Sequence, residues 1–223
     1  MCWNKNVSIA TFILAIIGVY YLYQRNGPND RWVALFAGTV AMIQLAEYFM
    51  WTDQTCSNIN KYASIFALLV LVLEPLTNMM GGIYFSNTPY KNILKYMLFA
   101  YIIFIAYTYF TEVYDKQINW CGTSLCNDIG TSGLSPTETN SIINTKACNL
   151  QWFFLNTMSP RTAIIWTLFL MLPFLTMTPM YQGIIILALG IITKTMASSS
   201  KGAATGSLWC WYAIGLILVK ILM

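Results

Sequence analysis

Long apolar stretches alternate with short polar segments along the whole chain. The stretches approach the ~20 residues that a helix needs to cross a bilayer. They cover residues 7–24, 32–52, 62–85, 92–112, 161–177, 180–197 and 204–222. The pattern therefore predicts an all-α membrane protein with seven transmembrane helices. The fifth and sixth stretches are short and are separated by a turn containing Pro179, so six spans with a re-entrant segment is the alternative.

Composition supports the membrane assignment. Of the 223 residues, 57% are hydrophobic and 9% are charged, whereas soluble domains contain about 25% charged residues. We expect one transmembrane domain over residues 1–223, with the bilayer as its partner. The net charge of +4 is spread over the loops without a basic cluster, so nucleic acid is not an expected partner.

The short loops indicate an orientation. If the N-terminus lies outside, one face carries a set of basic residues in short segments, with Asp30 as its only acid: Arg25, Arg31, Lys91, Lys95 and Lys220. Positive charge in short loops favours the cytoplasmic side. We therefore predict an outside N-terminus, a cytoplasmic C-terminus with Lys220 snorkelling to the interface, and a long outer loop over residues 113–160.

The cysteines favour the same orientation, because five of the six fall on the face opposite the basic loops. Disulfides form in oxidising compartments. We predict that two disulfides staple the outer loop between the fourth and fifth helices, with three pairings open. The four candidates are Cys56, Cys121, Cys126 and Cys148. Free thiols and half of a metal site are the alternatives, but the chain has no histidine, so no metal site is expected.

Two predicted spans carry a polar face with the helical spacing i, i+3, i+4, i+7. In the second span the face consists of Gln44, Glu47, Tyr48 and Trp51. In the third span the same spacing gives Glu74, Thr77, Asn78 and Gly81. Unsatisfied polar groups that face lipid cost several kcal/mol each. We therefore expect the two faces to meet each other or a common cavity.

Two residues of the last helices belong to the predicted outer part of this site. Lys194 and Trp209 fall at about the depth of Glu47 when each helical residue contributes ~1.5 Å. With Gln44 they are expected to line an outward-open pocket. The alternatives are a snorkelling Lys194 and a Glu47 that only joins two helices. Aromatic residues near predicted helix ends, including Trp120 and Trp152, are assigned to interfacial belts.

Glu74 is the deepest acid and is followed by a proline. A charge near the bilayer centre costs at least ~2.5 kcal/mol, so such a carboxylate is a hypothesis about an ion path. Pro75 lacks a backbone donor and so frees the carbonyl of Leu71, which predicts a kink. Freed carbonyls at broken helices coordinate cations in some transporters. A protonated, structural Glu74 is the alternative.

Three short motifs carry a resemblance. Residues 1–4 read Met-Cys-Trp-Asn, residues 44–51 contain Gln-x-x-Glu-x-x-x-Trp, and residues 207–211 read Ser-Leu-Trp-Cys-Trp. Together they resemble an uncharacterised family of multi-span membrane proteins from bacteria and giant viruses. The resemblance implies no activity, and Tyr48 replaces an expected glycine. It implies that these residues occupy motif positions: Cys2, Gln44, Glu47, Trp51, Trp209 and Cys210.

The leading hypothesis from the sequence is a channel or carrier that passes protons or small cations along Glu74 and Glu47. The rival is a receptor-like or interaction protein whose outer pocket binds an amphiphile or a partner protein. A retinal photoreceptor is less favoured, because Lys220 is too near the terminus and Lys194 lies on the wrong helix. Without histidine, the usual zinc and Ser-His sites are excluded, so an enzyme would have to depend on membrane carboxylates and is a less favoured alternative. No cofactor is expected. Self-association and the membrane, whether plasma, host or viral, are left open.

Overall fold

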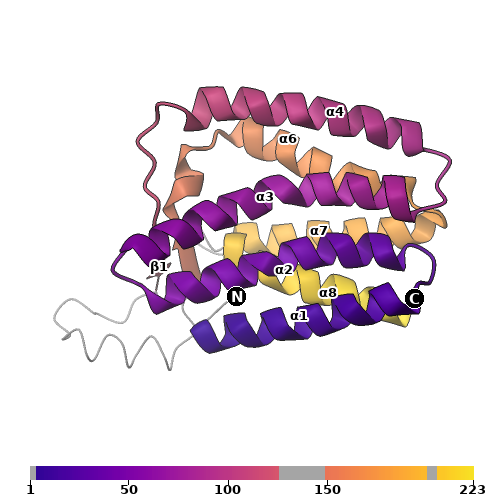
Figure 1. Ribbon diagram of the computed structural model, residues 1–223, viewed down its shortest axis with the longest axis horizontal. Coiled ribbons are helices and arrows are strands. Elements are labelled where there is room, and N and C mark those ends of the chain that lie inside the picture. Colours follow the sequence, from indigo (N-terminus) through magenta and orange to yellow (C-terminus); the bar gives the residue numbers. More distant parts are fainter. Residues whose placement is uncertain (1–3, 126–148, 200–204) are drawn as a thin grey trace.

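The computed structural model describes residues 4–125, 149–199 and 205–223 (Figure 1). Predictions about Cys2, Cys126 and Cys148 fall outside these residues. Lys194 and Trp209 belong to described helices, but their side chains are outside the described part. The predicted pocket of Gln44, Glu47, Lys194 and Trp209 is therefore described only at its first two residues.

The described chain is built almost entirely from helices. These are α1 (Lys5–Arg25), α2 (Asp30–Thr52), α3 (Asn58–Phe85), α4 (Lys91–Thr108), α6 (Pro160–Met171), α7 (Met180–Ser199) and α8 (Thr205–Leu222). A π-helical turn η1 (Tyr109–Val113) extends α4, and the 3₁₀ turns η2 (Phe153–Thr157) and η3 (Leu172–Thr176) flank α6. Strands β1 (Gly122–Leu125) and β2 (Asn149–Trp152) pair antiparallel. The all-α prediction is confirmed, and the short hairpin is an addition to it.

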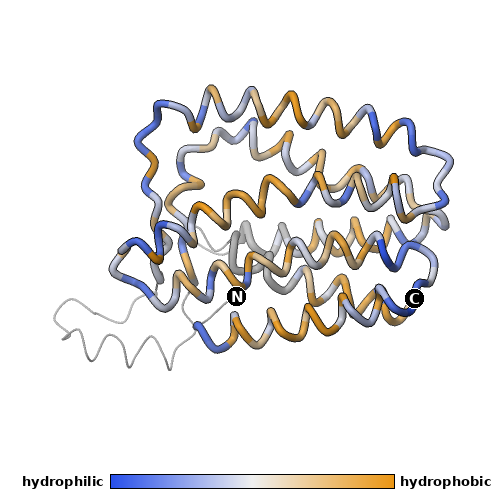
Figure 2. The backbone as a smooth tube through the Cα atoms, in the orientation of Figure 1, coloured by the Kyte–Doolittle hydropathy of each residue, from blue (hydrophilic) through white to orange (hydrophobic). Residues whose placement is uncertain are grey.

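Four helical segments are long and apolar enough to cross a membrane. They are Lys5–Arg25, Asp30–Thr52, Asn58–Phe85 and Lys91–Val113, and the described part also contains shorter apolar helices at Pro160–Thr176, Met180–Thr193 and Tyr212–Leu222. Figure 2 shows hydrophilic residues concentrated at the helix ends and connections. These lengths and compositions fit a membrane protein, while the number of spans stays a prediction.

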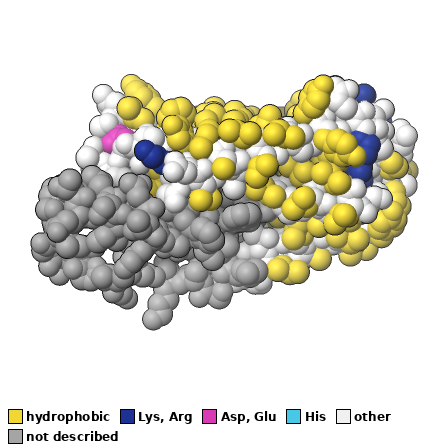
Figure 3. Space-filling model, turned by 90° about the horizontal axis from the view of Figure 1, so that it is seen from below, with side chains coloured by type: hydrophobic (Ala, Val, Ile, Leu, Met, Phe, Trp, Pro, Cys, Tyr) yellow, Lys and Arg dark blue, Asp and Glu magenta, His cyan; other side chains and the backbone are white. Residues whose placement is uncertain are grey.

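The helices lie alongside one another in a bundle (Figure 1). Its hairpin end carries β1 and β2, and its C-terminal end carries the end of α8. Helix α2 is the central helix and packs on α1, α3 and α8. Its fully buried side chains include Trp32, Phe36, Val40 and Ile43. On the side seen in Figure 3, apolar side chains cover much of the surface outside the grey region, as expected of a surface that faces lipid.

Local sequence explains several helix boundaries. The Asn4 side chain accepts a hydrogen bond from the Val7 N–H at 3.0 Å and so caps α1. The same helix ends at Asn26, which adopts a left-handed conformation with φ of 52°. Ser159 caps α6 through the Thr162 N–H, and Pro160 occupies the first helical position.

At the hairpin end, a disulfide and a pair of hydrogen bonds attach β1 to the α2–α3 connection and to the start of α3. The disulfide Cys56–Cys121 has a Cα–Cα distance of 5.4 Å, which confirms part of the predicted disulfide framework. The side chain of Asn60 donates to the Gly122 carbonyl and accepts from the Gly122 N–H, both at 2.8 Å. The hairpin is therefore fixed to the α2–α3 connection.

Asp53 organises the turn between α2 and α3. Its carboxylate accepts hydrogen bonds from the Ser57 and Thr55 hydroxyls and from the Asn60 backbone N–H. Burial of the carboxyl raises its pKa, but these hydrogen bonds outweigh burial and hold the pKa of Asp53 well below its usual range. The turn therefore depends on an ionised Asp53.

At the C-terminal end, the structure corrects the prediction that Lys220 snorkels. Lys220 is buried, with its Nζ 3.4 Å from Asp30 Oδ1 and donating to the Pro28 carbonyl at 2.6 Å. Arg25 contacts the same carboxylate, with Nε donating to Asp30 Oδ2 at 2.7 Å, and donates to the carbonyls of Lys220 and Ile221. The lysine turns inward because a buried carboxylate on α2 is available to pair with it. The signal was present in the sequence, since Asp30 is the only acid among these basic residues.

Candidate functional site

A cavity of about 540 Å³ lies between α3, α4 and α6 in the half of the bundle nearer the hairpin end. On α3 its lining comes from residues 65–72, and on α4 and η1 from residues 101–113. Helix α6 and the aromatic residues around the hairpin complete the wall. The residues used below are Ile65, Leu69, Leu71, Val72, Tyr101, Thr108, Tyr109, Trp120, Trp152, Thr162, Ala163 and Trp166.

The cavity exists because α4 packs closely on α3 only toward the C-terminal end. There Gly82 lies so close to α4 that a Cβ atom at this position would be 2.6 Å from Leu94 Cδ1. Along α4 itself, only Leu94 and Tyr101 are buried. Figure 1 shows α3 and α4 diverging toward the hairpin end. Large apolar side chains line the space that this divergence leaves.

The cavity opens sideways on the surface of the bundle. Ile65 is 40% exposed, Leu69 is 52% exposed and Tyr109 is 48% exposed, although all three also line the cavity. An apolar ligand could therefore reach the cavity from the side of the bundle, without passing through its core.

Two hydrogen bonds complete the wall around the Pro75 position. Trp166 Nε1 donates to the Leu71 carbonyl at 2.9 Å, and the Tyr101 hydroxyl donates to the Val72 carbonyl at 3.0 Å. Leu71 is the carbonyl that Pro75 was expected to free, because it lies four residues earlier. The sequence thus located the freed carbonyl correctly, but its partner is an indole from α6.

The roof of the cavity is an aromatic stack. The rings of Trp152 and Phe154 lie 5.7 Å apart at 14°, and those of Trp120 and Phe154 lie 5.9 Å apart at 26°. Trp152 is only 3% exposed, which corrects its assignment to an interfacial belt. Its indole nitrogen and the Thr108 hydroxyl are buried without a hydrogen-bond partner in the described part of the chain. Sequence reasoning missed both groups; two tryptophans on either side of the long loop were the available signal.

Glu112 joins two walls at the rim. Its carboxylate accepts from the Thr162 hydroxyl at 2.7 Å and from the Ser159 N–H at 3.2 Å. A carboxylate at this position also interacts favourably with the N-terminal dipole of α6. Thr162 lines the cavity, so Glu112 links the end of α4 to the α6 wall.

Four polar residues of the site that the sequence predicted on α2 and α3 are buried and do not line this cavity. Gln44, Glu47, Glu74 and Asn78 are each 0% exposed. The Gln44 side-chain oxygen accepts from the Thr11 hydroxyl of α1. Asn78 accepts from Trp32 Nε1 at 2.7 Å and donates to the Leu170 carbonyl at 2.7 Å. Gln44 and Asn78 therefore join neighbouring helices.

The two acids lie at different depths. Helices α2 and α3 run antiparallel, with Asn78 beside Trp32 and Asn60 beside the Met50 carbonyl. This register separates Glu47 from Glu74 by roughly eleven helical residues, or ~16.5 Å along the bundle. Glu74 interacts electrostatically with Tyr101 of α4 and Tyr212 of α8. Tyr101 also lines the cavity, so one neighbour of the deep acid is part of the cavity wall.

No protein-family model matches the chain, and no curated protein or solved structure shows significant similarity to it. The resemblance to the uncharacterised multi-span family stays a prediction. The functional argument therefore depends on the geometry of the cavity and of the buried polar residues.

Proposed function

We propose that the protein binds an amphiphilic ligand in the cavity between α3, α4 and α6. The observation that carries this proposal is an apolar cavity of about 540 Å³, which lies within the ~300–1,000 Å³ typical of small-molecule sites. Such sites combine a mostly apolar wall with a few polar groups. The lining here consists mostly of apolar and aromatic side chains, with three threonines among them: Thr108, Thr162 and Thr167.

The position of the cavity supports a ligand that arrives through the bilayer. Its exposed lining residues Ile65 and Leu69 lie on α3, one of the long apolar helices. An amphiphile dissolved in the membrane would meet this lateral opening directly. This is the receptor-like alternative that the sequence left open, with its binding site moved from the α2 face to α3, α4 and α6.

The test is saturable binding of a lipid-soluble probe to the protein in phosphatidylcholine nanodiscs. A tritium-labelled fatty acid methyl ester serves as the probe, and empty nanodiscs give the partition background. Ala163→Phe places a ring into the cavity and should abolish saturable binding. Ala106→Phe is the matched control, because Ala106 lies on α4, is exposed and is absent from the lining.

Saturable binding that Ala163→Phe removes and Ala106→Phe retains would support the proposal. Binding that both variants retain, or no binding above empty nanodiscs, would contradict it. The thermal unfolding of both variants should be recorded, so that loss of binding is not confused with loss of fold.

A second proposal is the passage of protons or small cations along Glu74 and Glu47. It is favoured by the full burial of both carboxyl groups on adjacent long apolar helices, because acids within a membrane helix are often functional. The test is proton flux into liposomes under an imposed potential. Glu74→Gln should abolish the flux, whereas Glu112→Gln, at the cavity rim, should not. Absence of flux in the wild-type protein would end this proposal.

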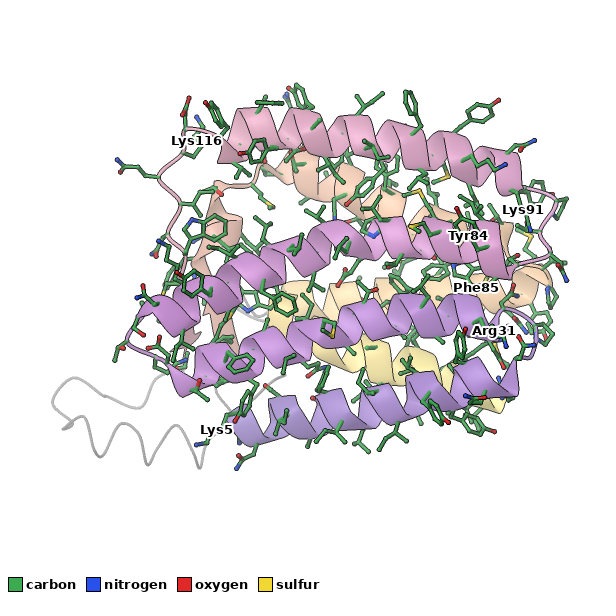
Figure 4. All side chains as sticks on the ribbon, in the orientation of Figure 1. Lys5, Arg31, Tyr84, Phe85, Lys91 and Lys116 are labelled. Carbon is green, nitrogen blue, oxygen red and sulfur yellow. A yellow bond between two sulfur atoms is a disulfide. The ribbon has the colours of Figure 1, made fainter. Side chains whose placement is uncertain are left out.

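The membrane topology is a further part of the proposal. We propose seven spans, with the hairpin end outside and the C-terminus in the cytoplasm of a plasma, host or viral membrane. The Cys56–Cys121 disulfide supports an oxidising environment at the hairpin end. Figure 4 places Arg31 and Lys91 at the opposite end from Lys5 and Lys116. Labelling of single introduced cysteines by a membrane-impermeant reagent tests this orientation.

A further inference from the structure

We propose that the amphiphile carries an uncharged headgroup with hydroxyl groups, and that this headgroup occupies a polar groove beside the cavity. This inference rests on the proposed binding function and adds a second part to its site. The groove has a volume of about 610 Å³ and lies at the hairpin end of the bundle. The lining residues used below are Thr111, Glu112, Lys116, Gln117, Asn156 and Met158.

The groove adjoins the cavity. Met158 lines both spaces. Thr162 in the cavity wall donates a hydrogen bond to the carboxylate of Glu112 in the groove wall, at 2.7 Å. Within the single turn η1, Tyr109 lines the cavity and Thr111 lines the groove. A ligand whose hydrocarbon chain lies in the cavity can therefore place its headgroup in the groove.

The two spaces lie at the depths that the two parts of an amphiphile prefer. The candidate span Lys91–Val113 ends beside the groove, and Lys116 and Gln117 follow in the connection beyond it. Tyr109 and Tyr114 at this end are 48% and 53% exposed, as expected of aromatic residues at the membrane interface. The groove is therefore expected at the level of the lipid headgroups, with the cavity beside the hydrocarbon.

The groove offers polar groups that a headgroup can reach. The side chains of Lys116, Gln117 and Asn156 are exposed and line it. An ammonium group donates hydrogen bonds, and each amide both donates and accepts. A hydroxyl can accept from the first group and exchange hydrogen bonds in either direction with the amides. A headgroup with several hydroxyls, such as glycerol, therefore fits this set, whereas a methyl ester has no donor to offer.

The charges of the groove favour a headgroup without charge. Lys116 and Glu112 are the charged residues of its described lining, so their formal charges cancel. Each Glu112 oxygen also accepts a hydrogen bond from the start of α6, one from Ser159 and one from Thr162. An anionic headgroup would gain the attraction of Lys116 and meet the repulsion of Glu112, and a cationic headgroup would experience the reverse. Hydroxyl groups avoid both penalties.

The experiment compares four amphiphiles with the same hydrocarbon chain, at equal mole fractions in phosphatidylcholine nanodiscs. A tritium-labelled monoacylglycerol is the probe, and the unlabelled methyl ester, ionised fatty acid and lysophosphatidylcholine compete with it. The monoacylglycerol should bind about fivefold more tightly than the ester, which is the typical effect of one neutral hydrogen bond. Stronger competition by the fatty acid or the lysophosphatidylcholine than by unlabelled monoacylglycerol would overturn the uncharged class.

Two substitutions test the groove. Lys116→Met and Asn156→Leu remove a polar group and keep most of the side-chain size at exposed positions. Together they should lower the affinity for monoacylglycerol to that for the ester. Lys61→Met is the matched control, because Lys61 is an exposed lysine at the start of α3 that lines neither space. The control should keep the wild-type preference.

The outcomes separate this inference from the proposed function. If neither monoacylglycerol nor ester binds saturably, the binding function itself is wrong. If both bind equally to the wild-type protein, or if the preference survives both groove substitutions, the function stands and the headgroup does not occupy the groove. If the double variant fails to fold, the order of competition in the wild-type protein and the single variant Asn156→Leu decide the question.

Discussion

At the contact between α1 and α8, Gly18 brings the helices so close that a Cβ there would lie 2.5 Å from Ile217 Cγ2. Helix α4, on the other side of the bundle, buries only Leu94 and Tyr101. Both regions are built from apolar helices of similar composition. Small residues let membrane helices approach, and a divergence between large side chains leaves space. The comparison contrasts the close packing around α1, α2 and α8, called the core below, with the cavity wall formed by α3, α4 and α6, called the wall below.

The largest loss of stability is expected when the ion pairs of Asp30 with Arg25 and Lys220 are broken. Asp30→Asn would leave buried Lys220 and partly buried Arg25 without their carboxylate, and breaking a buried ion pair costs about 3 kcal/mol or more. Unfolding in detergent, followed by intrinsic fluorescence, measures this loss. Asp115→Asn is the control at an exposed position. Equal stability of the two variants would mean that these ion pairs do not stabilise the core.

Loss of the Cys56–Cys121 disulfide should destabilise mainly the wall. Replacing Cys56 and Cys121 by Ala removes a link between residues 65 positions apart and should cost about 3 kcal/mol. Hydrogen exchange should accelerate in β1, β2 and η2, and saturable binding of the ester probe should weaken. Exchange in α1 and the described part of α8 should stay unchanged; equal acceleration in both regions would contradict the division into core and wall.

A smaller effect on stability is expected from substitutions that test the packing of the two regions directly. Gly18→Ala adds a methyl group where Ile217 already lies, and overpacking should outweigh the better helix propensity by about 1 kcal/mol. Gly38→Ala is the control, because its nearest side-chain neighbour would be an ordinary 3.6 Å away. Ala163→Phe should be tolerated despite its larger added volume, since it fills the cavity. A thermal-shift series that orders these three variants differently would refute the contrast in packing.

The smallest effect is a pH dependence at the hairpin end. The pKa of Asp53 lies below its usual range in the folded protein, so its contribution to stability is present above the unfolded pKa of about 3.9. As the pH falls below that value, the unfolded state takes up a proton first and stability declines. Unfolding temperatures between about pH 6 and pH 3 should show a shallower decline in Asp53→Asn than in the wild-type protein. Identical slopes would show that Asp53 does not contribute.

Much of the fold could be predicted because membrane helices leave a direct signal in hydropathy. The apolar runs correspond to the observed helices, and the polar face of α2 is buried as expected, with Gln44 and Glu47 inside the bundle. Cys56 and Cys121 were named among the disulfide candidates. Lys220 was predicted wrongly, because its pairing with Asp30 joins residues that are far apart in sequence.

The cavity could not be predicted, because its existence depends on the angle at which α4 leaves α3. Periodicity identifies the polar face of a helix but does not show where apolar faces separate. Trp152 illustrates the difference: its position beside a long loop fits an interfacial belt, and only the pairing of β2 with β1 turns it into the roof. The long-range contacts of the hairpin therefore determine the site.

The Glu112 carboxylate has a mechanical consequence for the wall of the cavity. Because it binds both the Ser159 backbone and the Thr162 side chain, the end of α4 and the start of α6 are held as one panel. The aromatic roof, in contrast, is anchored through Asn60 and the disulfide to the α2–α3 connection. The two parts of the cavity wall are therefore attached separately, the α4–α6 side through Glu112 and the roof through the hairpin's links to α2 and α3.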